Sequence, residues 1–342
     1  MESQKLIMIP AKTPSRQVSA WQRELARAIT DPAELLRELK LDPALLPAAR
    51  AAAARFPLRV PRGFVARMRE SDPDDPLLRQ VLPLGAELEA TPGFIADPVG
   101  DRAAQAVPGV LHKYHGRALL IATGACAVHC RYCFRREYPY TESHAGADQW
   151  RPALAYLTRD PSVREVILSG GDPLSLSDRR LGVLLTALEC IPHLERLRIH
   201  SRQPIVLPER VDEGLLALLA RTRLRLVLVV HANHPREMDA TVRAALARLA
   251  AAGVTLLNQS VLLRGVNDSA TTLAELSEAL FAARVLPYYL HLLDPVRGAA
   301  HFDVNEIEAS AIIKTLRRRL PGYLVPRLVR EQPEQPAKTL VG

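Results

Sequence analysis

Three of the four cysteines in this chain lie within eight residues of one another, in the stretch TGACAVHCRYCFRREY at residues 123–138. Cys126, Cys130 and Cys133 stand in a Cys-x3-Cys-x2-Cys spacing, and two arginines follow closely. Cysteines that cluster in this way in a chain of 342 residues favour metal binding or catalysis over disulfide bonds. The first chemical problem is therefore what three thiolates would hold.

A structural zinc ion normally has four cysteine or histidine ligands in a tetrahedron. His129 lies inside the motif, but its spacing to the cysteines is too tight to close a tetrahedron, and no second cysteine pair follows. A [4Fe–4S] cluster also normally takes four thiolates, so three leave one iron open. An open iron can bind a small molecule, and a low-potential cluster can deliver a single electron into that molecule.

Short apolar runs separated by helical patterns begin at residue 117, and they are typical of parallel strands buried on both faces. Six strands are predicted, at residues 117–123, 163–171, 194–202, 224–232, 254–263 and 286–293. The predicted helices between them include residues 181–191, 212–220, 235–253 and 269–284. Six consecutive β/α units without a Gly-x-Gly-x-x-Gly loop indicate an α/β fold, an incomplete (β/α)6 barrel.

The carboxyl ends of these predicted strands are unusually polar. In such barrels the chemistry sits at these ends, and polar residues in otherwise buried strands need partners. The polar positions after the cysteine loop are Gly170-Gly171-Asp172, Ser201-Arg202, His231 with Asn233, Asn258-Gln259, and Asp294. Asp172 or Asp294 alone could merely cap a following helix, but the whole set predicts one ligand-filled cavity.

Residues 1–104 are predicted to form a helical and irregular N-terminal extension. Apolar residues recur at helical spacing in residues 19–30, 31–39 and 43–56, with Ser19 and Asp31 as candidate N-caps. A proline-rich stretch at about 70–101 breaks this pattern and predicts a connector packed on a larger body. We assign residues 105–320 to the barrel and residues 321–342 to a short C-terminal segment.

The net charge of +8 and the pI near 9.6 would suit an acidic partner, but the excess of lysine and arginine is spread thinly. We expect no direct nucleic-acid binding, because the sequence has no aromatic-interleaved basic patch or nucleic-acid module signature. The run LRRRLP at residues 316–321 fits the solvated end of a helix. No apolar run approaches the roughly 20 residues that span a bilayer, and MESQKLIMIP lacks signal-peptide features. We therefore expect a cytoplasmic protein without membrane contact.

A Cys-x3-Cys-x2-Cys loop after the first strand of a six-unit barrel resembles the radical S-adenosylmethionine (SAM) enzymes. The resemblance implies that the open iron chelates the amino and carboxylate groups of SAM, and that reduction releases a 5′-deoxyadenosyl radical. The family's segment that positions the SAM amino group resembles Gly170, Gly171 and Asp172. Glycines at such a place let the backbone approach the ligand closely.

Within these enzymes, the chain resembles the lysine 2,3-aminomutases from about residue 105 to 340. The resemblance rests, in order, on HKYHGRALLIATGACAVHCRYCFRR, LSGGDPL, IHSRQPIVLPERV, HANHPREM, NQSVLLRGVND, LPYYLHLLDPVRGAAHF and VPRLVREQPEQPAKT. The preceding stretch, with FPLRVPRGFVARMRESDPDDPLLRQVLP, resembles the shorter branch of that family, which makes (R)-β-lysine for modification of elongation factor P (EF-P). The implied partners are L-lysine, a low-potential electron donor and the ligase that transfers the product to EF-P.

The resemblance implies a second cofactor, pyridoxal 5′-phosphate (PLP), bound as a Schiff base on a lysine. An imine can accept a migrating amino group. The PLP lysine matches Lys338 in PAKT, although EQPEQPA replaces the family's glycine-rich approach to it. The positions that hold the PLP phosphate match Lys113, Tyr114 and Arg117. Two positions that line the SAM and PLP cavity match His231 and Gln259.

The resemblance also implies how the amino acid is bound. Arg135 matches the arginine that takes the substrate carboxylate, a role that suits the planar fork of a guanidinium. The ε-ammonium of lysine calls for acidic partners, and the family's two carboxylates match Asp294 and Glu331. Since Glu331 is Asp in the usual pattern, its extra methylene would shift or weaken the lysine site. For Arg136 we prefer a surface ion pair without a catalytic role.

The longer aminomutases bind zinc through cysteines of a C-terminal extension and through one cysteine after the fifth strand. This chain has Ser269 in that stretch and its sequence runs to Gly342, so we predict no zinc. The remaining cysteine, Cys190, is predicted to be a buried helical residue.

Two alternatives to a lysine 2,3-aminomutase, an isomerase, stay open. One is an aminomutase for another amino acid such as glutamate. An enzyme that acts on glutamate would need cationic or neutral groups at the positions where this chain has acids. The other is a zinc-stabilised module that docks on a translation factor or RNA. We also allow for a homo-oligomer.

Overall fold

The computed structural model describes residues 18–140 and 150–341, and its centre is one ten-stranded sheet whose strands follow one another in chain order. The strands are β1 Gln105–Val107, β2 Val110–Tyr114, β3 Arg117–Thr123, β4 Glu165–Gly170, β5 Arg196–Ser201, β6 Arg225–Val230, β7 Thr255–Val261, β8 Leu286–His291, β9 Arg327–Arg330 and β10 Thr339–Leu340. Pairing is parallel from β3 to β9, and antiparallel hairpins add β1 and β2 at one edge and β10 at the other. This parallel-rich α/β sheet confirms the predicted fold class.

The six predicted strands are β3 to β8, and each lies within its predicted range. The parallel part has one more strand than predicted, because β9 pairs with β8. The signal for β9 is weak in the sequence. Its apolar pair, Leu328 and Val329, is flanked on both sides by arginine. Leu328 packs against the last helix, whereas Val329 faces the opposite side of the sheet, so each is buried by elements distant in the sequence.

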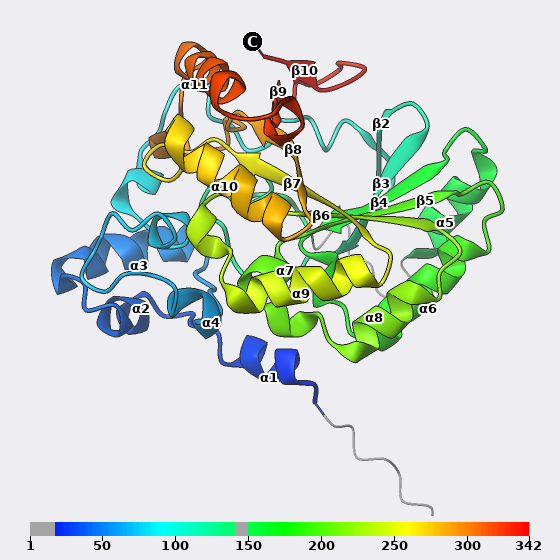
Figure 1. Ribbon diagram of the computed structural model, residues 1–342, viewed down its shortest axis with the longest axis horizontal. Helices are drawn as coiled ribbons and strands as arrows, with labels where there is room; N and C mark the ends of the chain where they lie inside the picture. The colour runs from blue at the N-terminus through cyan, green and yellow to red at the C-terminus, as the bar shows by residue number, and fades with distance from the viewer. Residues whose placement is uncertain (1–17, 141–149, 342) are drawn as a thin grey trace, which may run out of the picture.

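The helices of the structure are α1 Ala20–Ala26, α2 Pro32–Glu38, α3 Leu46–Arg55, α4 Arg62–Val65, α5 Trp150–Arg159, α6 Asp178–Glu189, α7 Gln203–Val206, α8 Glu213–Ala220, α9 Ala240–Ala251, α10 Ala270–Ala282 and α11 Glu306–Arg319. Figure 1 shows α2, α3 and α4 together on one side of the molecule and α5 and α6 on the opposite side, with the sheet between them. The main hydrophobic core lies between the sheet and the crossover helices α5, α6, α8 and α9. The rigid sheet ends can therefore present side chains to a common site.

Helix α6 shows how the sequence builds this layer and where one prediction was wrong. Its buried leucines recur at helical spacing, at Leu181, Leu184, Leu185 and Leu188, and form one apolar stripe. Cys190 is the C-cap of the helix and is exposed, not buried as predicted. The reason is geometric, since position 190 lies off the stripe that faces the core.

The described part of the predicted extension is packed on the sheet domain. The predicted helices within residues 19–56 are present, and the side chain of Asp31 caps α2 by accepting a hydrogen bond from the Ala33 amide at 3.0 Å. The proline-rich connector buries Leu77, Leu78, Val81 and Leu82 in a second hydrophobic cluster, as predicted. That cluster also contains Ala127 and Val128 of the cysteine loop. The extension therefore covers the loop that carries the three cysteines.

The end of α11 and the length of the helices bear on two further predictions. Helix α11 ends at Arg319 with its last three arginines exposed, which confirms the solvated helix end predicted from LRRRLP. Among the helices of residues 18–140 and 150–341, none is both long and apolar enough to cross a bilayer. The stretch MESQKLIMIP lies outside the described residues.

Candidate active site

A cavity of about 800 Å³ lies inside the curve of the sheet and reaches the carboxyl ends of its parallel strands. Most of the residues that the sequence suggested for a site line it: Cys126, Cys130, Cys133, Lys113, Tyr114, Arg117, Arg135, Gly170, Gly171, Asp172, Ser201, Arg202, His231, Gln259, Asp294, Glu331 and Lys338. Asn233 and Asn258 are instead buried, and their side-chain amides are hydrogen-bonded to other residues of the chain. Residues up to 225 positions apart in the sequence thus meet in one place, while the role of each remains a prediction.

The three cysteines occupy an irregular loop directly after β3. Burial raises the pKa of Cys126 well above its ordinary value, and the neighbouring Cys133, Asp172 and Cys130 add to this effect. Burial and then Cys130 raise the pKa of Cys133 to about 11. The thiols of Cys126 and Cys133 therefore need a positive partner to become thiolates. The iron of a [4Fe–4S] cluster supplies that charge, so the donor set fits such a cluster.

The glycine pair after β4 packs against the backbone of the cysteine loop. The Gly171 amide donates to the Thr123 carbonyl at 2.7 Å. A Cβ on Gly171 would lie 2.5 Å from the Ala125 carbonyl oxygen, and one on Gly170, whose φ is +111°, would lie 2.7 Å from the Thr123 oxygen. Only glycine fits at such a close approach. The pair therefore presents bare backbone beside the cysteines, which suits a ligand held at an open iron.

The carboxylate of Asp172 is fully engaged by its own chain. It accepts hydrogen bonds from the amide of Leu174 at 3.0 Å, the hydroxyl of Ser201 at 2.8 Å and the amides of Arg202 and Gln203 at 2.8 and 3.1 Å. These donors connect the ends of β4 and β5. In this structure Asp172 therefore holds the glycine turn in place, and a direct contact with SAM stays a prediction.

A buried carboxylate of the N-terminal extension holds the cysteine loop from the other side. Glu87 accepts two hydrogen bonds from Arg131, at 2.8 and 2.6 Å, and one from Arg136 at 2.7 Å. The side chains of Glu87, Arg131 and Arg136 are 1%, 0% and 5% exposed. Arg136 thus forms a buried ion pair with Glu87, not the surface ion pair that was predicted, because the N-terminal extension covers it. His129 is also occupied, since its Nδ1 lies 2.9 Å from the Pro57 carbonyl oxygen.

His231, at the end of β6, packs against the cysteine loop. Its Nε2 lies 2.9 Å from the hydroxyl of Tyr132, and the two rings are stacked with centroids 5.6 Å apart. Burial, followed by the nearby Arg202 guanidinium, lowers the pKa of His231 to about 3. The imidazole is therefore neutral at physiological pH. A neutral ring that lines the cavity is suited to contacts with an uncharged part of a ligand.

At the other end of the cavity, Glu331 is shared by three side chains. Its carboxylate pairs with the Lys338 ammonium, accepts a 2.9 Å hydrogen bond from the Tyr114 hydroxyl, and lies 3.4 Å from the Lys113 Nζ. Burial alone would raise the pKa of Glu331, but Lys338, Lys113 and Tyr114 outweigh burial and lower the pKa to about 2. Glu331 is therefore ionised, and Lys338 is held in the cavity by a salt bridge.

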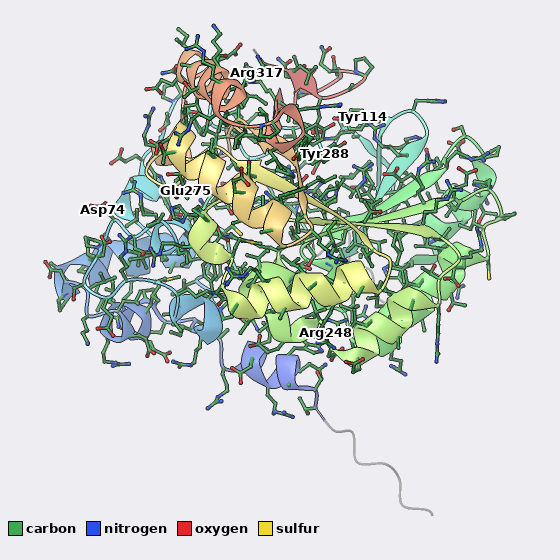
Figure 2. The ribbon with its side chains drawn as sticks, in the orientation of Figure 1. Asp74, Tyr114, Arg248, Glu275, Tyr288 and Arg317 are labelled. Carbon is green, nitrogen blue, oxygen red and sulfur yellow. The ribbon has the colours of Figure 1, made fainter. Side chains whose placement is uncertain are left out.

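Aromatic and basic side chains surround this end. The guanidinium of Arg117 lies over the Tyr114 ring, 4.5 Å from its centroid. Figure 2 shows Tyr114, from β2, and Tyr288, from β8, on the same side of the molecule, and both line the cavity. An amine, phenol hydroxyls and a guanidinium within one cavity are groups that can hold an aldehyde and a phosphate, so the residues fit PLP.

Asp294, the second predicted carboxylate, differs from Glu331. Burial raises its pKa to about 7, against the opposing effect of the Lys338 cation. Within the described residues, its carboxylate has no hydrogen-bond or salt-bridge partner from the chain. Asp294 is half-buried at the wall of the cavity, and a carboxylate without a partner in such a place is suited to a cationic ligand.

Arg135 lines the cavity, and its side chain is held by a carboxylate that the sequence did not suggest. Its Nε donates to Asp101 at 2.7 Å and its Nη1 to the Ser169 hydroxyl at 3.1 Å. Asp101 also pairs with Lys113 at 2.7 Å. Asp101 lies in the proline-rich connector, where no periodicity marks it, so no local signal could have identified it.

Two further residues were missed although the sequence does carry a signal for one of them. His200 and His291 line the cavity, and the Nε2 atom of each is buried without a partner among the described residues. Arg198 and His200 alternate with the apolar residues of β5, so a period of two marks them as facing the same side of the sheet. Burial lowers the pKa of both histidines well below the ordinary value.

The chain is similar in sequence to a known superfamily and to several named enzymes. The sequence pattern of the Radical SAM superfamily matches residues 120–276. The chain is 54% identical to the L-lysine 2,3-aminomutase of Escherichia coli K12, over 97% of this chain and 96% of that protein. It is 47% identical to the enzyme of the same name from Haemophilus influenzae, over 97% and 98%. With the L-lysine 2,3-aminomutase of Clostridium subterminale it shares 38% identity, over 81% of this chain and 67% of that protein.

Proposed function

This chain belongs to the lysine 2,3-aminomutase family of radical SAM enzymes, and we propose that it converts L-α-lysine to (R)-β-lysine with a [4Fe–4S] cluster, SAM and PLP. As an isomerase it moves an amino group within one molecule. We further propose that a low-potential donor supplies the electron and that an EF-P lysyl-transferring ligase receives the product in the cytoplasm. These last points rest on resemblance alone.

The observation that carries the proposal is that the candidate cofactor and substrate residues line one cavity. Three thiols and a bare glycine backbone lie at one end, and an amine with two carboxylates lies at the other. When bound, the cluster with SAM would supply a carbon radical, and PLP would supply the aldehyde carbon that holds the amino nitrogen of the substrate. The walls of the cavity would keep water and protein groups away from the radical, which is what such chemistry requires.

The charges at the Lys338 end support lysine as the substrate. Glu331 and Asp294 place two carboxylates at this end of the cavity, where they would pair with the ε-ammonium of lysine, while Arg135 would take the carboxylate. Glutamate would bring a second carboxylate toward these two acids, which repel it.

The direct test is anaerobic reconstitution of the full chain with iron, sulfide, PLP, SAM and a reductant, followed by incubation with L-lysine or L-glutamate. We expect β-lysine of R configuration from lysine and no β-glutamate. Formation of β-glutamate without β-lysine would overturn the substrate assignment. Zinc without iron, and no broad visible charge-transfer band, would instead indicate the zinc-stabilised binding module.

The PLP lysine has its own test. Borohydride reduction in the presence of PLP should label Lys338, and Lys338→Ala should abolish the label. The matched control is Lys314→Ala, which removes an exposed lysine of α11 and should leave the label unchanged. A label on another lysine in the unmodified chain would show that Lys338 is not the PLP lysine.

A further inference from the structure

Arg202 directs a buried positive charge at one of the three cysteine sulfurs. The residue follows β5, and its side chain is 6% exposed. Its Nη1 donates to the Cys130 sulfur at 2.8 Å and to the Tyr132 hydroxyl at 2.7 Å. Among the described residues, Cys130 is the only one of the three cysteines whose sulfur accepts a hydrogen bond from an arginine side chain.

The guanidinium is held in this orientation from several sides. Its Nη2 donates to Gln80 of the N-terminal extension at 2.6 Å and to Glu237, after β6, at 3.2 Å. Gln80 and Glu237 are themselves joined by a 3.1 Å hydrogen bond, and both are completely buried. The backbone amide of Arg202 donates to Asp172 at 2.8 Å. Arg202 therefore has no room to turn away from Cys130 without breaking buried hydrogen bonds.

A donor and a positive charge at a cluster ligand favour the more negative state of the cluster. Adding one electron to a cluster increases the negative charge on its cysteine sulfurs, so a nearby guanidinium stabilises the reduced state more than the oxidised state. Because Arg202 is buried, solvent screens this interaction only weakly. Cluster potentials respond to hydrogen bonds to sulfur, and Arg202 supplies one to Cys130.

We propose that Arg202 is a positioning residue that raises the reduction potential of the cluster through Cys130 and thereby eases its one-electron reduction. In this step the oxidised cluster takes one electron from an external low-potential donor and becomes the reduced cluster. No bond forms or breaks, and Arg202 keeps its proton. The inference rests on the proposed function, since it requires the cluster.

The test is a potentiometric titration of the reconstituted full chain, followed by electron paramagnetic resonance of the reduced cluster. For Arg202→Gln we expect the equilibrium constant of reduction to fall by at least about tenfold, which is 59 mV for a one-electron couple. Arg202→Lys keeps the charge but loses the fork, so a smaller decrease is expected. An unchanged potential in cluster-loaded Arg202→Gln would overturn the inference.

A matched control is Arg67→Gln. Arg67 is also buried beside Phe64 and donates to the carbonyls of Glu237 and Ile205 at 2.8 Å, but it has no contact with a cysteine. We expect the potential to stay at the wild-type value. A decrease equal to that of Arg202→Gln would show that any buried cation of this region acts in the same way, and the specific role of Arg202 would be lost.

A measurement on the unsubstituted chain keeps the inference testable if Arg202→Gln does not load a cluster. In protein labelled with 15N at the arginine guanidinium groups, pulsed paramagnetic resonance of the reduced cluster should detect a weakly coupled 15N nucleus. The coupling should disappear in Arg202→Lys and persist in Arg67→Gln. A loaded wild-type cluster without this coupling would contradict the inference alone. A wild-type chain that binds no cluster at all would also remove the proposed function.

Discussion

The charged side chains at the cysteine end and at the Lys338 end of the cavity are paired in different ways. At the cysteine end, buried guanidinium groups are paired with buried carboxylates: Glu237 pairs with Arg202, and Glu87 pairs with both Arg131 and Arg136. These pairs hold the cysteine loop, and Arg202 and Arg136 also line the cavity. At the Lys338 end, one carboxylate serves two lysines and a tyrosine inside the cavity, and Asp294 has no partner.

Because of this difference, the cysteine end keeps one geometry, whereas the carboxylates of the Lys338 end can change partners. Buried ion pairs that are joined by further hydrogen bonds hold one geometry, which a cluster with three fixed ligands requires. Shared and unpaired carboxylates can change partners when a cofactor and a substrate arrive. The cysteine end is thus organised before binding, whereas the Lys338 end is completed by its ligands.

The largest effect is expected when one of the three cysteines is substituted. Substitution of Cys126, Cys130 or Cys133 by Ala should abolish cluster loading and all detectable β-lysine formation, because two thiolates cannot hold the cluster with one iron open. The measurements are iron content, the visible spectrum and product analysis. Cys190→Ala, which removes the exposed cysteine, is the control and should keep full iron content. Equal iron in Cys126→Ala and wild type would refute the cluster assignment.

The next effect tests the rigidity of the cysteine end. Glu87→Gln should lower the free energy of unfolding by about 3–5 kcal/mol, because it leaves the buried Arg131 and Arg136 without their charge partner. Denaturant unfolding of the full chain measures this change. Glu89→Gln alters an exposed neighbour in the same segment and should stay within about 0.5 kcal/mol. Similar values for the two variants would mean that the pair does not hold the loop.

A third prediction concerns the unpaired acid of the Lys338 end. Asp294→Asn should raise the KM for lysine by roughly thirtyfold, equivalent to about 2 kcal/mol, since a buried charge pair with the ε-ammonium is lost. Steady-state kinetics of the reconstituted enzyme give this value. Asp303→Asn, at an exposed position, should leave KM unchanged. If Asp294→Asn also left KM unchanged, Asp294 would not contact the substrate.

The smallest effect is a pH dependence at the same residue. Because burial raises the pKa of Asp294 to about 7, its carboxyl group becomes neutral as the pH falls below this value. A neutral group no longer attracts the ε-ammonium, so kcat/KM for lysine should decrease on the acid side, by at most about tenfold per pH unit for one proton. Above about pH 7, kcat/KM should no longer change with pH. In Asp294→Asn the decrease at acid pH should be absent. If the decrease persisted in this variant, another group would be responsible for it.

The strands and the cysteine end were the parts most open to prediction from sequence. Buried parallel strands appear as continuous apolar runs, and the three cysteines lie within one loop, so both signals are local. The strand β9 and the exposed Cys190 were missed because their environment depends on packing against other elements. Asp101 and Glu87 were missed for the same reason, since each is a single acid in an irregular segment.

The sequence by itself determined the α/β layout and the cysteine motif, and its resemblance to a family identified the residues of the site. Periodicity and short spacings carry this information because they act over a few residues. Only the tertiary structure decided which charges are paired. It placed Arg202 against Cys130, covered Arg136 with Glu87 and left Asp294 without a partner. The physical reason is that the pairing and desolvation of a charge depend on groups that folding brings together from distant parts of the chain.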